Sequence, residues 1–182
     1  MSRPNIILCG PPFTGKSTLG KLAAVKLGWQ FHDTDQLLEK CYADEKTESL
    51  TFREIHRKEG NAVFRYYENR AVISLKDSDK CVIALGGGCL IQQENVLFLQ
   101  KLGILIYIKT PLTILKKRLL ENALPSYLEK EKEPVKAFES LVNARIAIYE
   151  KHAHKIIDTT SLNQDEVLSI LIKKGHDFEE SN

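Results

Sequence analysis

Residues 5–17 read NIILCGPPFTGKS, and this stretch decides the fold. A short apolar run over residues 5–9 is followed directly by the spacing G-x-x-x-x-G-K-S, which occupies residues 10–17. Apolar residues then recur at helical spacing over residues 16–27, so the order is strand, loop and helix. Glycines in such a loop let backbone N–H groups curl around phosphate oxygens, and the helix start adds the positive end of its dipole. The stretch therefore predicts a site for the phosphates of a nucleoside triphosphate.

Two side chains of this loop have specific predicted roles. Lys16 can reach the outer phosphates as a point charge, and the hydroxyl of Ser17 can ligate the Mg²⁺ ion that bridges them. The alternative is an ordinary glycine turn before a helix that carries a surface lysine. The predicted nucleotide-binding residues of the loop are Pro12, Phe13, Thr14, Gly15, Lys16, Ser17 and Thr18.

The composition of the chain excludes several classes of protein. The chain has 182 residues, 43% of them hydrophobic, which suffices for one core, so we expect a single domain over residues 1–182. With 27% charged residues and a formal net charge of +2, it resembles neither a disordered tail nor a strongly basic nucleic-acid binder. Its longest apolar runs, such as residues 104–108, are far shorter than the roughly 18 residues that suggest a membrane span. We expect a monomer with small-molecule partners and neither a nucleic-acid nor a membrane partner.

The compartment is predicted from two further signals. The phosphate-loop pattern begins so close to the N-terminus that we expect no removable secretory leader. The four cysteines form no close C-x-x-C pair and no zinc-type spacing with histidine, so we expect reduced thiols. Both signals favour a soluble, cytoplasmic protein.

Strand and helix signals alternate to the end of the chain. Short apolar runs predict strands over residues 5–9, 29–33, 81–85, 104–108 and 155–158. Helical patterns cover residues 16–27, 34–41, 51–75, 93–101, 112–120, 134–152 and 164–173, with Gly60 dividing the longest. Five short apolar strands separated by helices predict an α/β fold of three layers, in which helices cover both faces of a five-stranded parallel sheet.

One segment breaks this rhythm. Residues 121–134 are polar and dense in charge, and prolines occur within and at the end of the segment. Its length favours a mobile lid over the alternative, an ordinary solvated loop.

A triphosphate site does not distinguish a kinase from other nucleotide-binding proteins, so the acceptor side needs its own signals. Asp33-Thr34-Asp35 is the first of these. If the motif ends a strand, the strand period of two points both carboxylates toward the carboxyl edge of the sheet. One carboxylate could then lie near the metal and the other accept a proton from an acceptor hydroxyl. Capping of the next helix by Asp33 or Asp35 is the alternative, and the two roles can coexist.

Three features further along the chain also suit a small acceptor. Arg65 and Glu68 lie three apart on one helical face, where they form either a surface pair or a guanidinium fork for a substrate carboxylate. The glycines at residues 86–88 allow a ligand to approach bare backbone, with a plain flexible turn as the alternative. Arg145 could swing toward the phosphates, although an exposed helical arginine is the commoner explanation.

These elements, in this order, resemble the shikimate kinase family, a branch of the P-loop kinases related in fold to the nucleoside monophosphate kinases. The resemblance covers about residues 5–160 and rests on the phosphate loop and on the motifs Asp33-Thr34-Asp35, Phe64-Arg65 with Glu68, Leu85-Gly86-Gly87-Gly88, and Arg145 before Tyr149. It implies transfer of the γ-phosphoryl group of ATP to the 3-hydroxyl of shikimate with Mg²⁺, in chorismate and aromatic amino-acid biosynthesis. A related kinase for gluconate or a nucleoside monophosphate, and a non-catalytic nucleotide-binding relative, are the alternatives.

The resemblance also implies roles for individual residues. Asp35 looks like the residue that contacts the shikimate hydroxyls and acts as the base, with Lys16 as the second catalytic residue. Ser17 and Asp33 look like the residues nearest the metal. The implied substrate-binding residues are Asp35, Arg65, Gly86, Gly87, Gly88 and Arg145. On the nucleotide side, Arg118 resembles a family residue that packs near adenine, with Lys117 as the alternative, and residues 158–161 resemble the adenine-side loop.

The lid departs from the family pattern. Family lids usually carry an arginine immediately before a proline, whereas Leu124 precedes Pro125 in this chain. Leucine cannot stabilise the charge of a transferring phosphoryl group, and the loss of an arginine-type contact costs several orders of magnitude in rate. Either Lys130, Lys132 or Arg118 supplies the missing cation, or the enzyme relies on Mg²⁺, Lys16 and Arg145.

Overall fold

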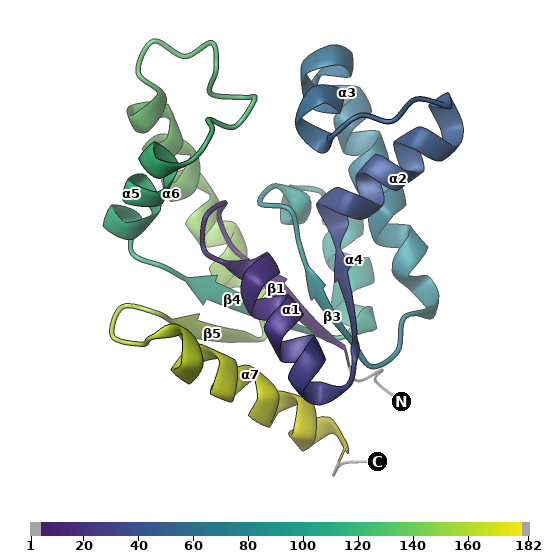
Figure 1. The fold of residues 1–182 in the computed structure, drawn as a ribbon, viewed down its shortest axis with the longest axis vertical. Helices are drawn as coiled ribbons and strands as arrows, with labels where there is room; N and C mark the ends of the chain where they lie inside the picture. Colours follow the sequence, from purple (N-terminus) through teal and green to yellow (C-terminus); the bar gives the residue numbers. More distant parts are fainter. Residues whose placement is uncertain (1–4, 180–182) are drawn as a thin grey trace.

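The chain folds around one sheet with helices on both sides (Figure 1). The computed structural model describes residues 5–179, and residues 1–4 and 180–182 of the predicted domain lie outside the described residues. The strands are β1 (Ile6–Cys9), β2 (Gln30–Asp33), β3 (Cys81–Ala84), β4 (Ile104–Lys109) and β5 (Lys155–Asp158). The helices are α1 (Lys16–Leu27), α2 (Thr34–Lys46), α3 (Phe52–Ile73), α4 (Gln93–Leu102), α5 (Leu112–Glu121), α6 (Pro134–His152) and α7 (Gln164–Glu179), and the short 3₁₀ helices are η1 (Ser74–Asp77) and η2 (Cys89–Ile91).

The sheet is parallel throughout, as the alternation of strands and helices predicted. Its strand order is β2-β3-β1-β4-β5, so β1 lies at the centre and pairs with β3 on one side and β4 on the other. The carboxyl ends of β1, β2 and β3 therefore meet at one edge, which is where ligands bind in sheets of this kind.

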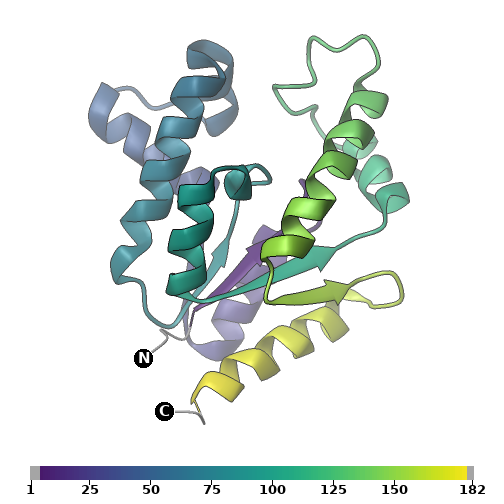
Figure 2. The same cartoon turned by 180° about the vertical axis from the view of Figure 1, so that it is seen from behind.

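Helices cover both faces of the sheet. α1 and α7 pack on one face, where they meet Ile6 and Leu8 of β1 (Figure 1). The C-terminal half of α3, together with α4 and α6, packs on the other face around Ile7 and Cys9 (Figure 2). Because both faces are buried, the strand reads as a continuous apolar run instead of an alternating one. Within residues 5–179, no helix combines the length and the apolar character needed to cross a membrane.

Helix boundaries differ most from the prediction. α2 runs to Lys46 instead of ending at Cys41, because residues 42–46 contain neither glycine nor proline and the chain leaves the helix only at Thr47, with φ 55°. α7 likewise extends to Glu179. The predicted division of the longest helix is confirmed, since Gly60 has φ 79° and ψ 177° inside α3, a conformation that glycine alone adopts readily.

Two pairs of helices extend beyond the carboxyl edge of the sheet (Figure 1). In one, α2 and α3 enclose a core of their own that includes Tyr42 and Tyr67. In the other, α5 and α6 pack around Phe138, and the irregular segment between them, residues 122–133, contributes the buried Leu128. That segment corresponds to the predicted lid, and Leu128 anchors it to the helices on either side.

Candidate active site

A cavity of about 620 Å³ opens at the carboxyl edge of the sheet. Its walls come from the phosphate loop, the start of α2, α3, the glycines after β3, the lid and α6. The predicted site residues that line it are Pro12, Phe13, Gly15, Lys16, Ser17, Thr18, Asp33, Asp35, Arg65, Gly86, Gly87, Gly88 and Arg145. Thr14 and Arg118, the other predicted site residues, lie outside this wall. The fold thus brings together groups that lie far apart in the sequence.

The start of α1 offers hydrogen-bond donors to this cavity. Gly15 caps the helix with φ 88°, a left-handed conformation that favours glycine, and no side chain caps the first turn. The first turn also contains no acidic residue. Its backbone N–H groups and the positive end of the helix dipole therefore favour an anion at this position.

Lys16 is held against its own loop. Its Nζ donates hydrogen bonds to the carbonyl oxygens of Gly10 at 2.9 Å and Pro11 at 2.7 Å, and to Oγ1 of Thr14 at 3.3 Å. Burial lowers the pKa of Lys16 to about 8, and the negative charge of Asp35 opposes that shift. The ammonium group can exchange these loop oxygens for phosphate oxygens. Oγ1 of Thr14 donates to the carbonyl oxygen of Pro11 at 3.1 Å, a hydrogen bond within the loop.

Ser17 and Asp33 meet at the predicted metal position. The Ser17 hydroxyl donates to Oδ2 of Asp33 at 2.6 Å, and Oδ1 of Asp33 accepts from the backbone N–H of Asp35 at 3.0 Å. Asp33 therefore caps α2 while its other oxygen faces Ser17. Hydroxyl and carboxylate oxygens are the ligands that Mg²⁺ takes from proteins, alongside water and phosphate oxygens, so this donor set fits Mg²⁺.

Asp35 reaches the cavity by a different route from the one predicted. β2 ends at Asp33 and Thr34 already begins α2, so the strand period of two does not relate the two carboxylates. The buried Thr34 instead accepts a hydrogen bond through Oγ1 from the backbone N–H of Gly86, at 2.8 Å. This contact holds the strand-to-helix turn against the neighbouring strand and brings both carboxylates into one cavity.

The environment of Asp35 favours its protonated form. Burial raises its pKa to about 7, the charges of Asp33 and Glu68 add to the rise, and Lys16 opposes it. A pKa near neutrality suits a carboxylate that accepts a proton from a hydroxyl group. Gly86 leaves the room that this side chain needs, since a Cβ atom at that position would lie 2.5 Å from Oδ1 of Asp35.

Arg65 and Glu68 form a buried pair and not the solvated surface pair that was the alternative. Nη1 of Arg65 donates to Oε2 of Glu68 at 2.7 Å, and the two side chains are only 20% and 3% exposed. Burial raises the pKa of Glu68, and Arg65 opposes that rise. Gly88 fits against the guanidinium, because a Cβ atom there would lie 2.5 Å from Nη1. The guanidinium is therefore fixed in direction at the cavity wall.

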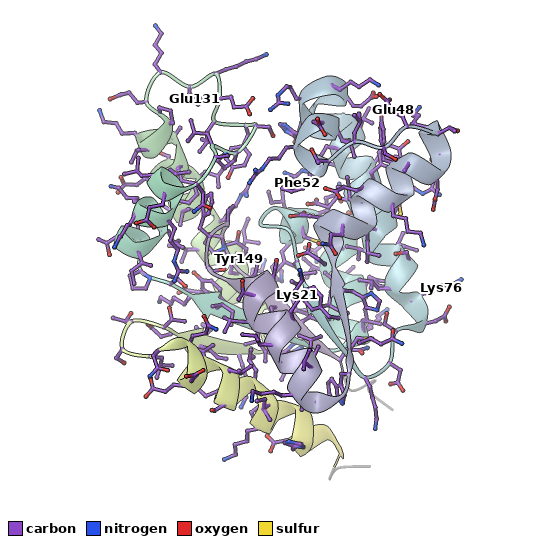
Figure 3. All side chains as sticks on the ribbon, viewed as in Figure 1. Lys21, Glu48, Phe52, Lys76, Glu131 and Tyr149 are labelled. Atoms are coloured by element: carbon purple, nitrogen blue, oxygen red, sulfur yellow. The ribbon has the colours of Figure 1, made fainter. Side chains whose placement is uncertain are left out.

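Arg145 also lies at the cavity and not in open solvent. Its Nη1 donates to the carbonyl oxygen of Gly87 at 3.2 Å, and the hydroxyl of Tyr149 donates to the same oxygen (Tyr149 is labelled in Figure 3). Gly87 packs against Pro12, since a Cβ atom at position 87 would lie 2.8 Å from Cδ of that proline. Each of the three consecutive glycines thus packs against a different residue of the cavity wall. A plain flexible turn, the alternative, would not require such close contacts.

Arg118 contacts the phosphate loop from outside the cavity. Its Nη1 donates to the backbone carbonyl of Phe13 at 2.7 Å, whereas Lys117 is exposed and 3.9 Å from Glu121. Of these two alternatives for the adenine side, Arg118 is the one that touches the nucleotide loop. Residues 158–161 form hydrogen bonds among themselves and with the end of β4, and they do not line the cavity.

The cavity wall also contains polar residues that the sequence did not single out. They are Gln36 and Glu39 of α2, Arg53, His56 and Asn61 of α3, and Ser126 and Tyr127 of the lid. Asn61 lies four residues before Arg65, so the helical face of that arginine leads to it. The other two residues of α3 precede the kink at Gly60, where the helical phase is broken, and the irregular lid has no periodicity to follow.

Comparison with known proteins gives the family. The sequence model described as shikimate kinase matches residues 12–175. The chain belongs to the shikimate kinase family. A shikimate kinase of Clostridium botulinum (strain Loch Maree / Type A3) is 36% identical over 169 residues, which are 93% of this chain and 94% of that relative. A shikimate kinase of Thermodesulfovibrio yellowstonii is 34% identical over 170 residues, with the same two coverages.

A solved structure agrees with this assignment. Shikimate kinase from Acinetobacter baumannii, in complex with shikimate, has a TM-score of 0.82 at 30% identity, over 94% of this chain and 92% of that one. Shikimate kinases are ATP-dependent phosphotransferases, so the predicted enzyme class and the three-layer P-loop kinase fold are confirmed.

Proposed function

We propose that this chain transfers the γ-phosphoryl group of ATP to the 3-hydroxyl of shikimate, giving shikimate 3-phosphate and ADP. One observation carries the proposal: a single cavity joins the phosphate loop to the carboxylate of Asp35 and to the buried, oriented guanidinium of Arg65. Shikimate offers a hydroxyl group to Asp35 and a carboxylate to Arg65. The reaction is a step toward chorismate and the aromatic amino acids.

On the nucleotide side, backbone N–H groups of residues 13–18 hold the phosphates of ATP. Lys16 releases its loop carbonyls and contacts the outer phosphates, and Arg118 lies on the adenine side of the loop. Ser17 and Asp33 would hold Mg²⁺, which would neutralise negative charge on the phosphate oxygens. The uncapped start of α1 supports this assignment, because its donors are directed at the same place.

On the acceptor side, Asp35 accepts the proton of the 3-hydroxyl as that oxygen attacks the γ-phosphorus. Arg65 holds the shikimate carboxylate with the fixed orientation that Glu68 gives it, and Arg145 is the second carboxylate contact. Residues 86–88 let the ring of the acceptor approach the backbone. The close fit of these glycines against the cavity walls supports their role.

The proposal extends to the working unit. The chain acts as one kinase domain over residues 1–182, with residues 121–134 as a lid that excludes water, so that ATP hydrolysis is suppressed. We also propose a cytoplasmic monomer that uses Mg²⁺ and has neither a nucleic-acid nor a membrane partner. The near-neutral net charge of +2 supports the absence of a nucleic-acid partner. Light scattering after size-exclusion chromatography tests the monomer, and a stable dimer at assay concentrations would contradict it.

The decisive experiment is an ADP-release assay with ATP and Mg²⁺, with and without shikimate. We expect ADP release to depend on shikimate and to be negligible with gluconate or a nucleoside monophosphate as the acceptor. The matched negative control is Lys16→Ala, which removes the loop cation and is expected to abolish turnover. No shikimate-dependent ADP in the wild-type chain would contradict the proposed function, and binding of ATP without any turnover would favour a non-catalytic relative.

A further inference from the structure

Arg53 is a cation of the cavity wall that forms no ion pair among residues 5–179, although its charge helps to lower the pKa of Glu129 in the lid. It lies in the first turn of α3, directly after Phe52, and its guanidinium carbon is 5.4 Å from the centroid of the Phe52 ring (Phe52 is labelled in Figure 3). Its Nε is buried, and among residues 5–179 this atom has no hydrogen-bond partner. A buried donor of a charged group costs free energy when it stays unpaired. Such an arrangement is expected where a ligand completes the hydrogen bonds.

The other arginine and lysine side chains of the cavity wall already have partners. Lys16 donates to carbonyl oxygens of its loop, Arg65 to a carboxylate of its own helix, and Arg145 to a backbone carbonyl. In the described part of the chain, Arg53 is therefore the arginine or lysine of the cavity wall whose buried donor still lacks a hydrogen-bond partner.

The lid touches α3 close to this arginine. Oγ of Ser126 lies 3.3 Å from Nδ1 of His56. One helical turn of α3 away from Arg53, Arg57 donates two hydrogen bonds to Glu129, at 3.0 and 2.6 Å. Hydrogen bonds thus join the lid to the first turns of α3, and residues of both segments line the cavity.

Tyr127 supplies a second unpaired polar atom in the same cavity. Its hydroxyl is buried and lacks a hydrogen-bond partner among residues 5–179. Burial raises the pKa of Tyr127 to about 12, and Arg145 and Arg53 are the cations close enough to oppose the rise. Tyr127 of the lid and Arg53 of α3 therefore each have an unpaired hydrogen-bond donor, and both residues line the same cavity.

The lid brings no cation of its own to this space. Lys130 and Lys132 are exposed and lie outside the cavity wall, and Leu124 is also exposed. Arg118 donates to a backbone carbonyl of the phosphate loop and lies outside the wall as well. None of the three cations considered from the sequence as replacements for a lid arginine lines the cavity.

We propose that Arg53 contacts the transferring phosphoryl group from the side of α3, beneath the lid, with Tyr127 as its neighbour. This inference rests on the proposed function. There, Arg65 and Arg145 hold the acceptor carboxylate and Lys16 approaches the phosphates from the loop, so the phosphoryl oxygens on the lid side are the anion that lacks a cation. The negative charge on those oxygens during transfer is what an arginine stabilises in phosphoryl-transfer enzymes.

Steady-state kinetics of Arg53→Gln and Arg53→Lys test this role. Because the contact acts on the transferring group, Arg53→Gln is expected to lower kcat on the order of 10²–10³-fold with little change in the shikimate KM. Arg53→Lys keeps the charge and is expected to retain more of kcat than Arg53→Gln. The matched control is Arg70→Gln, an exposed arginine of the same helix that pairs with Glu45 and should keep the wild-type kcat. Thermal melting verifies that every variant is folded.

Two results would overturn the proposal. A wild-type kcat with a raised shikimate KM would assign Arg53 to the acceptor carboxylate, and kinetics equal to those of the wild type would leave it no role in the reaction. Calorimetric titration gives an independent readout. Arg53→Gln is expected to lose about tenfold or more in affinity for shikimate 3-phosphate while keeping its affinity for shikimate, and equal losses for both ligands would contradict the assignment.

Failure of the proposed function would look different from failure of this inference. It would appear in the wild-type chain as ATP turnover that does not respond to shikimate. In that case the same variants are compared for ATP hydrolysis alone. A lower kcat of hydrolysis in Arg53→Gln than in Arg70→Gln supports the phosphoryl contact, and undiminished hydrolysis overturns it.

Discussion

Gly86 and Asp35 fit together so closely that a Cβ atom at position 86 would lie 2.5 Å from Oδ1 of the aspartate. The backbone of Gly86 does not have a positive φ, so an alanine at this position would be strained by the carboxylate and not by its own conformation. The requirement for glycine thus comes from a residue that is distant in the sequence.

Gly86→Ala is therefore expected to displace Asp35 while leaving the fold intact. A shift of about 1 Å in a reacting group costs on the order of 10²-fold in rate, so we expect a loss of that size in kcat. The control is the drop in melting temperature that Gly86→Ala causes in an Asp35→Ala background, which should be smaller because the clash is gone. A wild-type kcat in the single variant would contradict the fit.

Arg65→Gln is expected to raise the KM for shikimate on the order of 10²-fold and to change the KM for ATP little. A hydrogen-bonded guanidinium that holds a carboxylate contributes mostly to binding of the ground state. Arg65→Lys keeps the charge but loses the fork, so it should recover only part of the affinity. Arg70→Gln again serves as the control on α3. Equal increases of both KM values would speak against the carboxylate contact.

The ion pair between Arg57 and Glu129 links α3 to the lid. The two side chains are 50% and 36% exposed, so water and salt screen the pair and it should contribute little to the free energy of unfolding. Its loss in Arg57→Gln should nevertheless favour lid opening, with a several-fold rise in shikimate-independent ATP hydrolysis. The assay is ADP release without an acceptor, at low and at high salt.

A charge exchange provides the control for that prediction. Arg57→Glu combined with Glu129→Arg restores the ion pair with reversed polarity and should return hydrolysis toward the wild-type level. If the double variant hydrolysed ATP as fast as Arg57→Gln, the pair would have no part in closing the lid.

Asp35→Asn is expected to stabilise the ligand-free protein in metal-free buffer at pH 8. The pKa of Asp35 is about 7 in the folded chain against an ordinary value of 3.8, so the folded state favours the protonated form. The stability that this group contributes is complete below about pH 3.8, declines as the pH rises, and is lost above about pH 7. At pH 8 the ionised carboxylate lies beside Asp33 and Glu68, and an amide removes that repulsion.

We expect a gain of about 1–3 kcal/mol at pH 8 in chemical denaturation with a chelator present, and a smaller gain at pH 5. The same variant should lose turnover, because the amide cannot accept the proton of the acceptor hydroxyl. A gain that grew as the pH fell would show that the shift has the opposite sign.

Much of the site could be predicted because its signals are local. The phosphate loop occupies consecutive residues, and the pairing of Arg65 with Glu68 follows from helical spacing alone. The parallel sheet was predictable for a similar reason, since continuous apolar runs separated by helices leave few other arrangements. The interpretation of Asp33 and Asp35 reached the right cavity through the wrong geometry, because it applied the strand period of two beyond residue 33, where the strand ends and the helix begins.

The sequence by itself determined the phosphate loop, the alternation of strands and helices, and the residue types of the acceptor side. Tertiary structure alone decided that β3 lies between β2 and β1, which sets Gly86 against Asp35, and that Arg53 reaches the cavity from beyond the kink at Gly60. The physical reason is that backbone geometry and hydrogen bonding fix spacing only within one element. Which distant side chains share a cavity depends on how the elements pack against one another. The periodicity of the sequence does not predict that packing.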